Sequence, residues 1–394
     1  MRKSFHIALL LILLFSPGSA AQFRRSAPAP EYVPLVPEYE IPFPRPLHDA
    51  LDTLSVYIIG DVMMHSSQFS KDHRIFFSNI APKMRGADIC IANMEFTLAG
   101  PPYSGYPAFS SPEYIAGYMA DDCGTDVFLT ANNHILDKGT KGIRRTLEIY
   151  DGLADSLGIR HTGSALDENQ RQANYPLILE RKGFRIALIN FTYGNNLGPQ
   201  DKWPMVNEMK ENDIHAAFER AKEQEAEFII ALPHWGVEYQ LRHSSQQERW
   251  AKWLVDEGAD VIVGGHPHVV QDTTHIKGVP VFYSLGNAVS NMSIENSRLE
   301  LAVTLRFVVD RASGEKTMLE PQLDFMWCTL PGNLTGSYAT IYVKEWASRR
   351  GDWLNPSDFD NMTGTLERVM DATGIGLEGY YSCATFEYFS YFSM

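Results

Sequence analysis

Seven short apolar runs lie between residues 54 and 287 of the chain. The apolar stretch of each run is four to eight residues long, and it ends at polar or glycine-containing sequence. This is the pattern of strands that are buried on both faces of a sheet. The runs read LSVYIIG, DICIAN, DVFLTA, RIALINFT, EFIIALPHWG, DVIVGGHPH and VPVFYSLGN.

Helical patterns alternate with several of these runs. Residues 139–158 place apolar side chains on one helical face, with Thr140 as the expected N-cap and Gly158 as the closing residue. Residues 244–258 and 213–224 repeat the pattern, and in the first of these Trp250 and Trp253 are expected to face the core. Strands that alternate with helices predict an α/β fold.

The chain changes character at both ends. Residues 1–21 carry two charges, then an apolar run, then small residues at the expected cleavage site. This pattern predicts a secretory signal peptide and a secreted, periplasmic or envelope location. Without cleavage, the segment would be an N-terminal anchor. Residues 22–52 hold seven prolines between Pro28 and Pro46 and predict a linker, although a leader strapped over the surface fits equally. We expect a main domain over 53–290 and a β-rich extension over 291–394 with one helix near Leu366.

The composition bears on which ligands and cross-links the protein can have. The formal charge of −14 becomes −16 when Arg2 and Lys3 leave with the signal peptide, so no nucleic-acid binding is expected. The four cysteines, Cys90, Cys123, Cys328 and Cys383, have no zinc-site spacing. One disulfide of open pairing is compatible with an oxidising compartment, whereas Cys90 lies in an apolar strand and is read as a buried thiol.

Polar side chains with metal-ligand chemistry follow five of the predicted strands. In an open α/β sheet the carboxyl ends of the strands form the binding edge, so these side chains are expected to meet there. Each group alone can also be explained as a turn or helix-cap residue, and only the joint occurrence favours a site. The residues are Asp61 and His65; Asn93 and Glu95; Asn132, Asn133, His134 and Asp137; His234 and Glu238; and His266 and His268.

Several imidazoles with carboxylates and amides, and no thiolates, suit divalent zinc, manganese or iron. About eight candidate ligands exceed the needs of one ion, so we expect two. Paired ions activate a water and clamp an in-line displacement, which predicts a phosphoester or similar substrate. We assign His65 to metal binding, and Asn93, Asn132 and Glu238 to substrate binding.

The motifs GDVMMH, NMEFTLAG, NNHILDKGTKGI, HWGVEY, GGHPHVVQ and YSLGN, in this order from about Ser55 to Asn287, resemble the CapA family of poly-γ-glutamate capsule synthesis proteins. That family belongs to the calcineurin-like metallophosphoesterase superfamily, and FTYGNN also resembles one of its loops. The resemblance implies a four-layer α/β/β/α sandwich around a metal centre. It also implies capsule-polymer synthesis or anchoring, with an anionic polymer or phosphoester as substrate and membrane polymer-synthase subunits as partners.

The resemblance also implies residue roles. Asp61 and His268 would bind the first metal, and Glu95 would take the bridging place. Asn133, His234 and His266 would bind the second metal. His134 would assist the leaving oxygen, and Asp137 would orient His134.

Two departures from the superfamily pattern weaken the first site. Met63 stands where the superfamily has a histidine, with His65 two residues later, and Glu95 replaces an aspartate. Two rival hypotheses therefore stay open: a general periplasmic metallophosphoesterase acting on nucleotides or phosphodiesters, and a non-catalytic structural subunit of a polymer synthesis or export complex.

Overall fold

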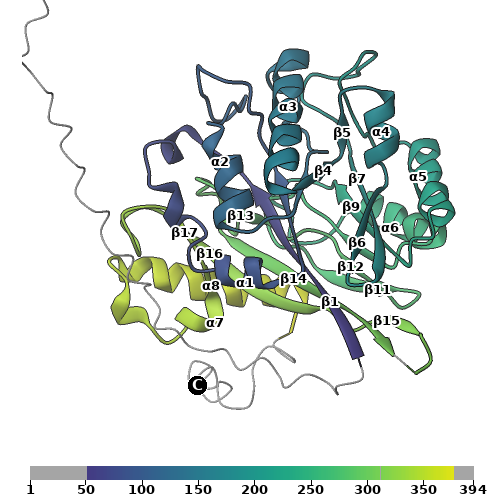
Figure 1. Cartoon of the computed structure of the whole chain (residues 1–394). Coiled ribbons are helices and arrows are strands. Elements are labelled where there is room, and N and C mark those ends of the chain that lie inside the picture. The colour runs from purple at the N-terminus through teal and green to yellow at the C-terminus, as the bar shows by residue number, and fades with distance from the viewer. Residues whose placement is uncertain (1–50, 311, 377–394) are drawn as a thin grey trace, which may run out of the picture. The chain divides into compact units, whose positions relative to one another are not determined.

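A computed structural model describes residues 51–310 and 312–376. The predicted signal peptide and all but the last two residues of the predicted linker lie outside the described residues, as does Cys383. Figure 1 shows the arrangement of the helices and strands. No helix in the described ranges combines the length and apolar character needed to cross a bilayer.

Two large sheets form the centre of the fold. The first has the order β17-β16-β14-β1-β2-β3-β4, with β13 paired to β1 and β15 to β14, and the second has the order β11-β12-β10-β9-β7-β6. The strands of the first sheet are β1 (Leu51–Val62), β2 (Ile89–Met94), β3 (Val127–Leu129), β4 (Arg160–Thr162), β13 (Asn287–Val289), β14 (Leu299–Asp310), β15 (Lys316–Met318), β16 (Gln322–Thr329) and β17 (Ala339–Tyr342). The second sheet contains β6 (Leu177–Arg181), β7 (Phe184–Thr192), β9 (Phe228–His234), β10 (Val261–Val263), β11 (Thr273–Ile276) and β12 (Val279–Phe282), and a small ribbon pairs β5 (Ser164–Ala165) with β8 (Met205–Val206).

Helices cover the outer face of each sheet. The α-helices are α1 (Ala81–Gly86), α2 (Tyr114–Gly117), α3 (Gly139–Leu157), α4 (Glu168–Asn174), α5 (Glu211–Glu223), α6 (Ser245–Glu257), α7 (Val343–Trp346) and α8 (Pro356–Thr373). Single turns lie at η1 (Ser66–Gln68), η2 (His73–Ile75) and η4 (Arg350–Asp352), and a π-helical turn, η3 (Tyr118–Asp122), extends α2. The helix α3 starts one residue before the expected Thr140 cap, with Lys138 at the N-cap, and it ends as predicted at Gly158, whose φ is 75°.

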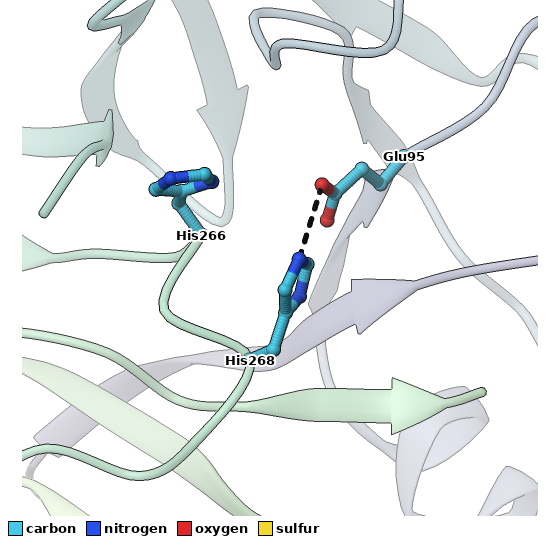
Figure 2. A group of neighbouring side chains, drawn as sticks. All are labelled: Glu95, His266 and His268. Atoms are coloured by element: carbon cyan, nitrogen blue, oxygen red, sulfur yellow. Dashed lines mark ion pairs between the residues drawn. The ribbon is translucent and has the colours of Figure 1, made fainter. Parts of the chain in front are cut away.

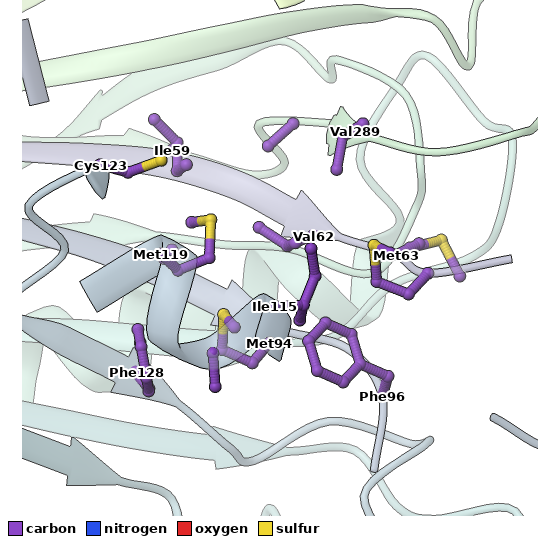
Figure 3. Close-up of a cluster of buried hydrophobic side chains, with 14 of the residues drawn as sticks. Ile59, Val62, Met63, Met94, Phe96, Ile115, Met119, Cys123, Phe128 and Val289 are labelled. Carbon is purple, nitrogen blue, oxygen red and sulfur yellow. The ribbon is translucent and has the colours of Figure 1, made fainter. Parts of the chain in front are cut away.

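Three apolar cores separate the four layers. One lies between the first sheet and the helices α2 and α3, one between the two sheets, and one between the second sheet and α5 and α6. Figure 3 shows part of the first core, where Val62 and Phe128 of the sheet face Ile115 and Met119 of the helical layer. Successive side chains of β1 point to opposite faces of the first sheet, so Ile58 packs in the core between the sheets and Ile59 packs in the core beneath α2 and α3. The predicted four-layer α/β/β/α sandwich is confirmed.

The segment after residue 291 is β-rich, as predicted, and it completes the first sheet. β14 runs antiparallel to β1 over eight residue pairs, from Leu51–Asp310 to Ile58–Val303. The helix α8 packs its apolar face into the middle core with β14 and β16. The sheet therefore runs without interruption across residue 290. Trp250 and Trp253 are only half-buried, with ring centroids 5.2 Å apart on the outside of the third core.

Candidate metal centre

Ligand-type side chains from both sheets converge where parallel strands end. Asp61 is the second-last residue of β1, Glu95 follows β2, and His234 is the last residue of β9. Two groups of buried side chains bring their ligand atoms within 4.8 Å of one another: Glu95 with His266 and His268, and Asp61 with Glu95 and His234. Figure 2 shows the Glu95 carboxylate and the His268 ring facing each other, with His266 beside them.

Asp61 is held firmly by its neighbours. It accepts a hydrogen bond from Asn93 Nδ2 at 2.7 Å and one from the backbone N–H of His266 at 3.0 Å. Burial alone would raise the pKa of the Asp61 carboxyl, but the imidazoles of His268 and His234 and the Asn93 amide hold it well below its usual range. Asp61 is therefore an ionised, oriented ligand.

Glu95 is the least satisfied group of the site. It is fully buried, and neither carboxylate oxygen has a hydrogen-bond partner among the described residues. The nearest imidazole nitrogens are His234 Nε2 at 3.6 Å and His268 Nε2 at 3.8 Å from Oε1. A buried carboxylate without partners is costly, so both oxygens are available to a cation.

The loop after β10 presents two imidazoles from an unusual backbone. His266 and His268 have φ values of 99° and 58°, a region that non-glycine residues rarely adopt. Gly265 lets this loop approach Asp61, because a Cβ there would lie 2.8 Å from Asp61 Oδ1. His268 Nδ1 lies 2.9 Å from Asn287 Oδ1; with its proton on Nδ1 the ring keeps Nε2 free for a ligand role.

The two imidazoles of this loop differ in charge. Burial, together with His234 and His268, lowers the pKa of His266 well below its ordinary value, so this ring is neutral and its Nδ1 has no partner among the described residues. Burial would also lower the pKa of His268, but the carboxylates of Glu95, Asp61 and Glu238 raise it to about 9. Without a cation at the centre, His268 thus carries the compensating positive charge.

Amide side chains link the two sheets. Asn132 Nδ2 donates to Asn93 Oδ1 at 3.1 Å, and Asn133 Oδ1 lies 2.8 Å from His234 Nε2. Both asparagines are buried in the turn after β3. The turn therefore contributes an oxygen to the second-sheet half of the centre and a support to the first-sheet half.

A histidine–carboxylate pair borders the centre. His134 Nδ1 lies 2.6 Å from Asp137 Oδ2, and its ring packs edge-on against Phe109 with centroids 4.7 Å apart. Burial would lower the pKa of His134, but Asp137 and Glu95 raise it above its ordinary value. His134 thus retains a proton more readily than a free histidine.

Two predicted site residues lie apart from these groups. His65 begins the turn η1, where its Nδ1 accepts a hydrogen bond from the Asn291 N–H at 3.3 Å and its ring packs on Phe109, so it joins neither ligand group. Glu238 is exposed after β9 and acts on the site through its charge on His268. The predicted metal role of His65 is not supported by its position.

Three further residues touch the site and were not assigned from the sequence. Asn287 orients His268, the half-exposed Tyr193 packs on His266 with ring centroids 4.5 Å apart, and Asn196 reaches His134 and Asp137. The motifs YSLGN and FTYGNN contain all three, so the only sequence signal was their place in those motifs.

The donor set fits divalent cations. It combines buried carboxylate oxygens without partners, neutral imidazole nitrogen and an amide oxygen, which are ligands of zinc, manganese and iron. Glu95 belongs to both ligand groups and is therefore placed between them.

The sequence profile of a known family matches residues 55–292, which is more than half of the chain, and is described as the bacterial capsule synthesis protein PGA_cap. The chain belongs to the PGA_cap family. Every ligand-type residue discussed above falls within the matched range, whereas β14 to β17 and α8 lie beyond it.

Relatives of this PGA_cap protein carry capsule names. It is 27% identical over 258 residues to the capsule biosynthesis protein CapA of Bacillus anthracis, covering 61% of each chain. It is also 27% identical over 258 residues to the PGA biosynthesis protein CapA of Bacillus subtilis, covering 63% of this chain and 66% of the relative. The match thus spans less than two thirds of either relative.

Solved structures of other proteins show a weaker likeness. A phosphatase from Mycoplasma pneumoniae aligns with a TM-score of 0.39 and 14% identity, over 70% of this chain and 94% of that one. A 5′-nucleotidase from Candida albicans aligns with a TM-score of 0.38 and 13% identity, over 66% and 52%.

Proposed function

We propose that this PGA_cap protein is a metal-dependent hydrolase of the cell envelope that acts in the synthesis or anchoring of a capsule polymer of the poly-γ-glutamate type. The observation that carries the proposal is Glu95, a fully buried carboxylate that lies beside imidazoles of the other sheet and has no hydrogen-bond partner among the described residues. The names of the two Bacillus relatives support the polymer. The sequence of residues 1–21 supports export.

The residues divide into two ligand sets that share Glu95. Asp61 and His234 form one group, and His266 and His268 form the other. Together with Asn133, which lies beside His234, these residues would hold two divalent ions, with manganese, iron or zinc as candidates. The family resemblance divides the same residues differently, with Asp61 and His268 on one ion and Asn133, His234 and His266 on the other. When bound, such ions lower the pKa of a water and neutralise charge that develops on a phosphoryl or acyl oxygen.

The chain's own groups supply the proton transfer. His134 faces Asp137 through Nδ1, so Nε2 is the nitrogen available to a leaving oxygen or nitrogen. Its raised pKa favours the protonated ring that a general acid needs. The substrate bond would be a γ-glutamyl amide or a phosphoester within or beside the polymer, and membrane synthase subunits are the proposed partners.

The test measures metal and turnover together. Purified protein is analysed for bound metals and assayed on poly-γ-glutamate and on a panel of phosphodiesters, beside Glu95→Gln and His266→Ala. The matched control is His275→Ala, because His275 is exposed and, among the described residues, its ring forms an ion pair only with Glu320, at 3.6 Å. We expect both site variants to lose metal and activity, and the control to keep both.

Other outcomes would replace the proposal. Turnover of small phosphodiesters without cleavage of the polymer would indicate a general metallophosphoesterase. Bound metal without turnover of any substrate, together with capture of membrane synthase subunits, would indicate a structural subunit. An absence of metal in the wild type would refute the proposal.

A further inference from the structure

Asn196 connects a loop of the second sheet to the histidine–carboxylate pair of the first. It lies between β7 and β8, and its backbone N–H donates to the Asn133 carbonyl oxygen at 3.1 Å. Its side-chain Nδ2 lies 3.2 Å from Asp137 Oδ1 and 3.2 Å from His134 Nδ1. One neutral amide thus touches both members of the pair.

The hydrogen bonds of Asp137 show what this amide does. Oδ2 accepts from the Phe109 N–H at 2.8 Å and faces His134 Nδ1 at 2.6 Å. Oδ1 accepts from Asn196 alone among the described residues. Because a carboxylate can only accept, Asn196 must present its NH2 group there, and this contact fixes the rotation of the carboxylate.

The orientation of Asp137 in turn decides the tautomer of His134. With Asp137 fixed, the proton of the neutral ring lies on Nδ1, and Nε2 is left for chemistry. The loop itself is anchored, since the Tyr193 N–H donates to the His234 carbonyl oxygen at 2.9 Å. Backbone hydrogen bonds at Tyr193 and Asn196 therefore hold both ends of this four-residue span and fix the position of Asn196.

We propose that Asn196 is a positioning residue that sets the orientation of His134 for proton donation to the leaving group. The inference rests on the proposed hydrolase function for its kinetic consequence. A donor that acts through His134 matters most when the leaving group is a poor one, because a good leaving group departs without a proton.

The kinetic test compares two phosphodiesters that differ only in the leaving group, p-nitrophenolate against a simple alkyl alcohol. Asn196→Ala should lower kcat for the alkyl ester by roughly tenfold or more, the effect of losing a hydrogen bond to a charged group. It should lower kcat for the p-nitrophenyl ester less than about threefold, with KM and metal content unchanged.

The matched control is Asn195→Ala. Asn195 lies on the same loop, but its side chain bonds Glu208 and the Leu197 N–H and has no contact with His134. This variant should leave both esters unaffected. Equal losses for both esters, a loss confined to KM, or the same loss in Asn195→Ala would overturn the proposal.

A second measurement does not depend on turnover. The ring 15N signals of His134 in the full chain, assigned by comparison with His134→Ala, report its tautomer directly. At a pH high enough for the ring to be neutral, the wild type should show the Nδ1–H form, and Asn196→Ala should shift the signals toward a mixture, while Asn195→Ala should not. Unchanged His134 signals in Asn196→Ala would refute the positioning role. If no ester is cleaved but the signals shift, the hydrolase proposal fails and the positioning role stands.

Discussion

Replacing Glu95 with glutamine should change the stability of this protein in opposite directions with and without metal. Glutamine keeps the shape of the side chain and removes its charge. In the metal-free protein, Glu95 and Asp61 are two buried carboxylates that face one charged imidazole, His268. One negative charge is in excess, and removing it should stabilise the fold by about 1–3 kcal/mol, the scale of an unsatisfied buried polar group.

The magnitude converts into a melting temperature. An unfolding entropy of about 2.1 cal/mol/K per residue gives roughly 0.7 kcal/mol/K for the roughly 325 residues that the structure describes. The metal-free variant should therefore melt about 1.5–4 °C above the wild type. A ligand at one hundred times its Kd stabilises by about 2.7 kcal/mol, so metal should raise the wild-type melting temperature by about 4 °C.

Calorimetry of chelator-treated protein, with and without added manganese or zinc, tests whether the order of the two melting temperatures reverses. The variant should exceed the wild type without metal and fall below it with metal, because a shared ligand is missing. Glu320→Gln, an exposed glutamate outside the site, should behave as the wild type in both conditions. A variant that is less stable without metal, and that keeps the full metal response, would refute the reasoning about buried charge.

Three further predictions follow from other contacts. Burial raises the pKa of Glu300 from 4.5 to about 8, despite the hydrogen bond from the Gly60 N–H. The stability that the protonated Glu300 contributes is therefore full below about pH 4.5. As the pH rises from there to about 8, this contribution falls by about 1.4 kcal/mol per pH unit. In metal-free protein, the difference in urea-unfolding free energy between wild type and Glu300→Gln should show this slope, and a difference that does not vary with pH would contradict it. Tyr193→Ala should raise KM several-fold with kcat nearly unchanged in steady-state assays, because the half-exposed ring extends the wall beside His266; a fall in kcat alone would be inconsistent with a binding role. Asp358→Ala leaves Arg298 without the carboxylate that binds it at 2.5 and 2.6 Å, so urea unfolding should report a loss of about 3–5 kcal/mol, whereas a loss below about 1 kcal/mol would show that the pair is solvated.

The strand pattern predicted the layers of the fold because both faces of each sheet are covered. A strand such as β2, in which every residue is buried, must read as a continuous apolar run, and helices with one apolar face must cover it. The strand pattern could not predict which strands pair with each other. The apolar run of β14 reads equally well in a separate extension or beside β1, and only the backbone hydrogen bonds decide between them.

The sequence likewise predicted some residues of the candidate site and not others. Residues at the carboxyl ends of strands or directly after them, such as Asp61, Glu95 and His234, could be grouped because the topology brings strand ends together. His65 could not be placed by its spacing, because η1 begins at once after it and the Gln68 side chain accepts the His65 backbone N–H at 2.6 Å. Asn196 depends on a contact across 59 positions with Asp137, which no local pattern records.

The cost of burying Glu95 would couple the folding of this chain to the binding of a cation. Its carboxylate is fully buried, and the loop that carries His266 and His268 adopts backbone angles that are themselves unfavourable. Each of these features lowers the free energy of unfolding of the metal-free chain. A bound cation would neutralise the excess charge at Glu95 and relieve the cost of burying it, and this gain in free energy would add to the affinity for the cation. The same residues would therefore lower the stability of the metal-free protein and raise the stability of the metal-bound protein. Calorimetry with and without metal measures both effects.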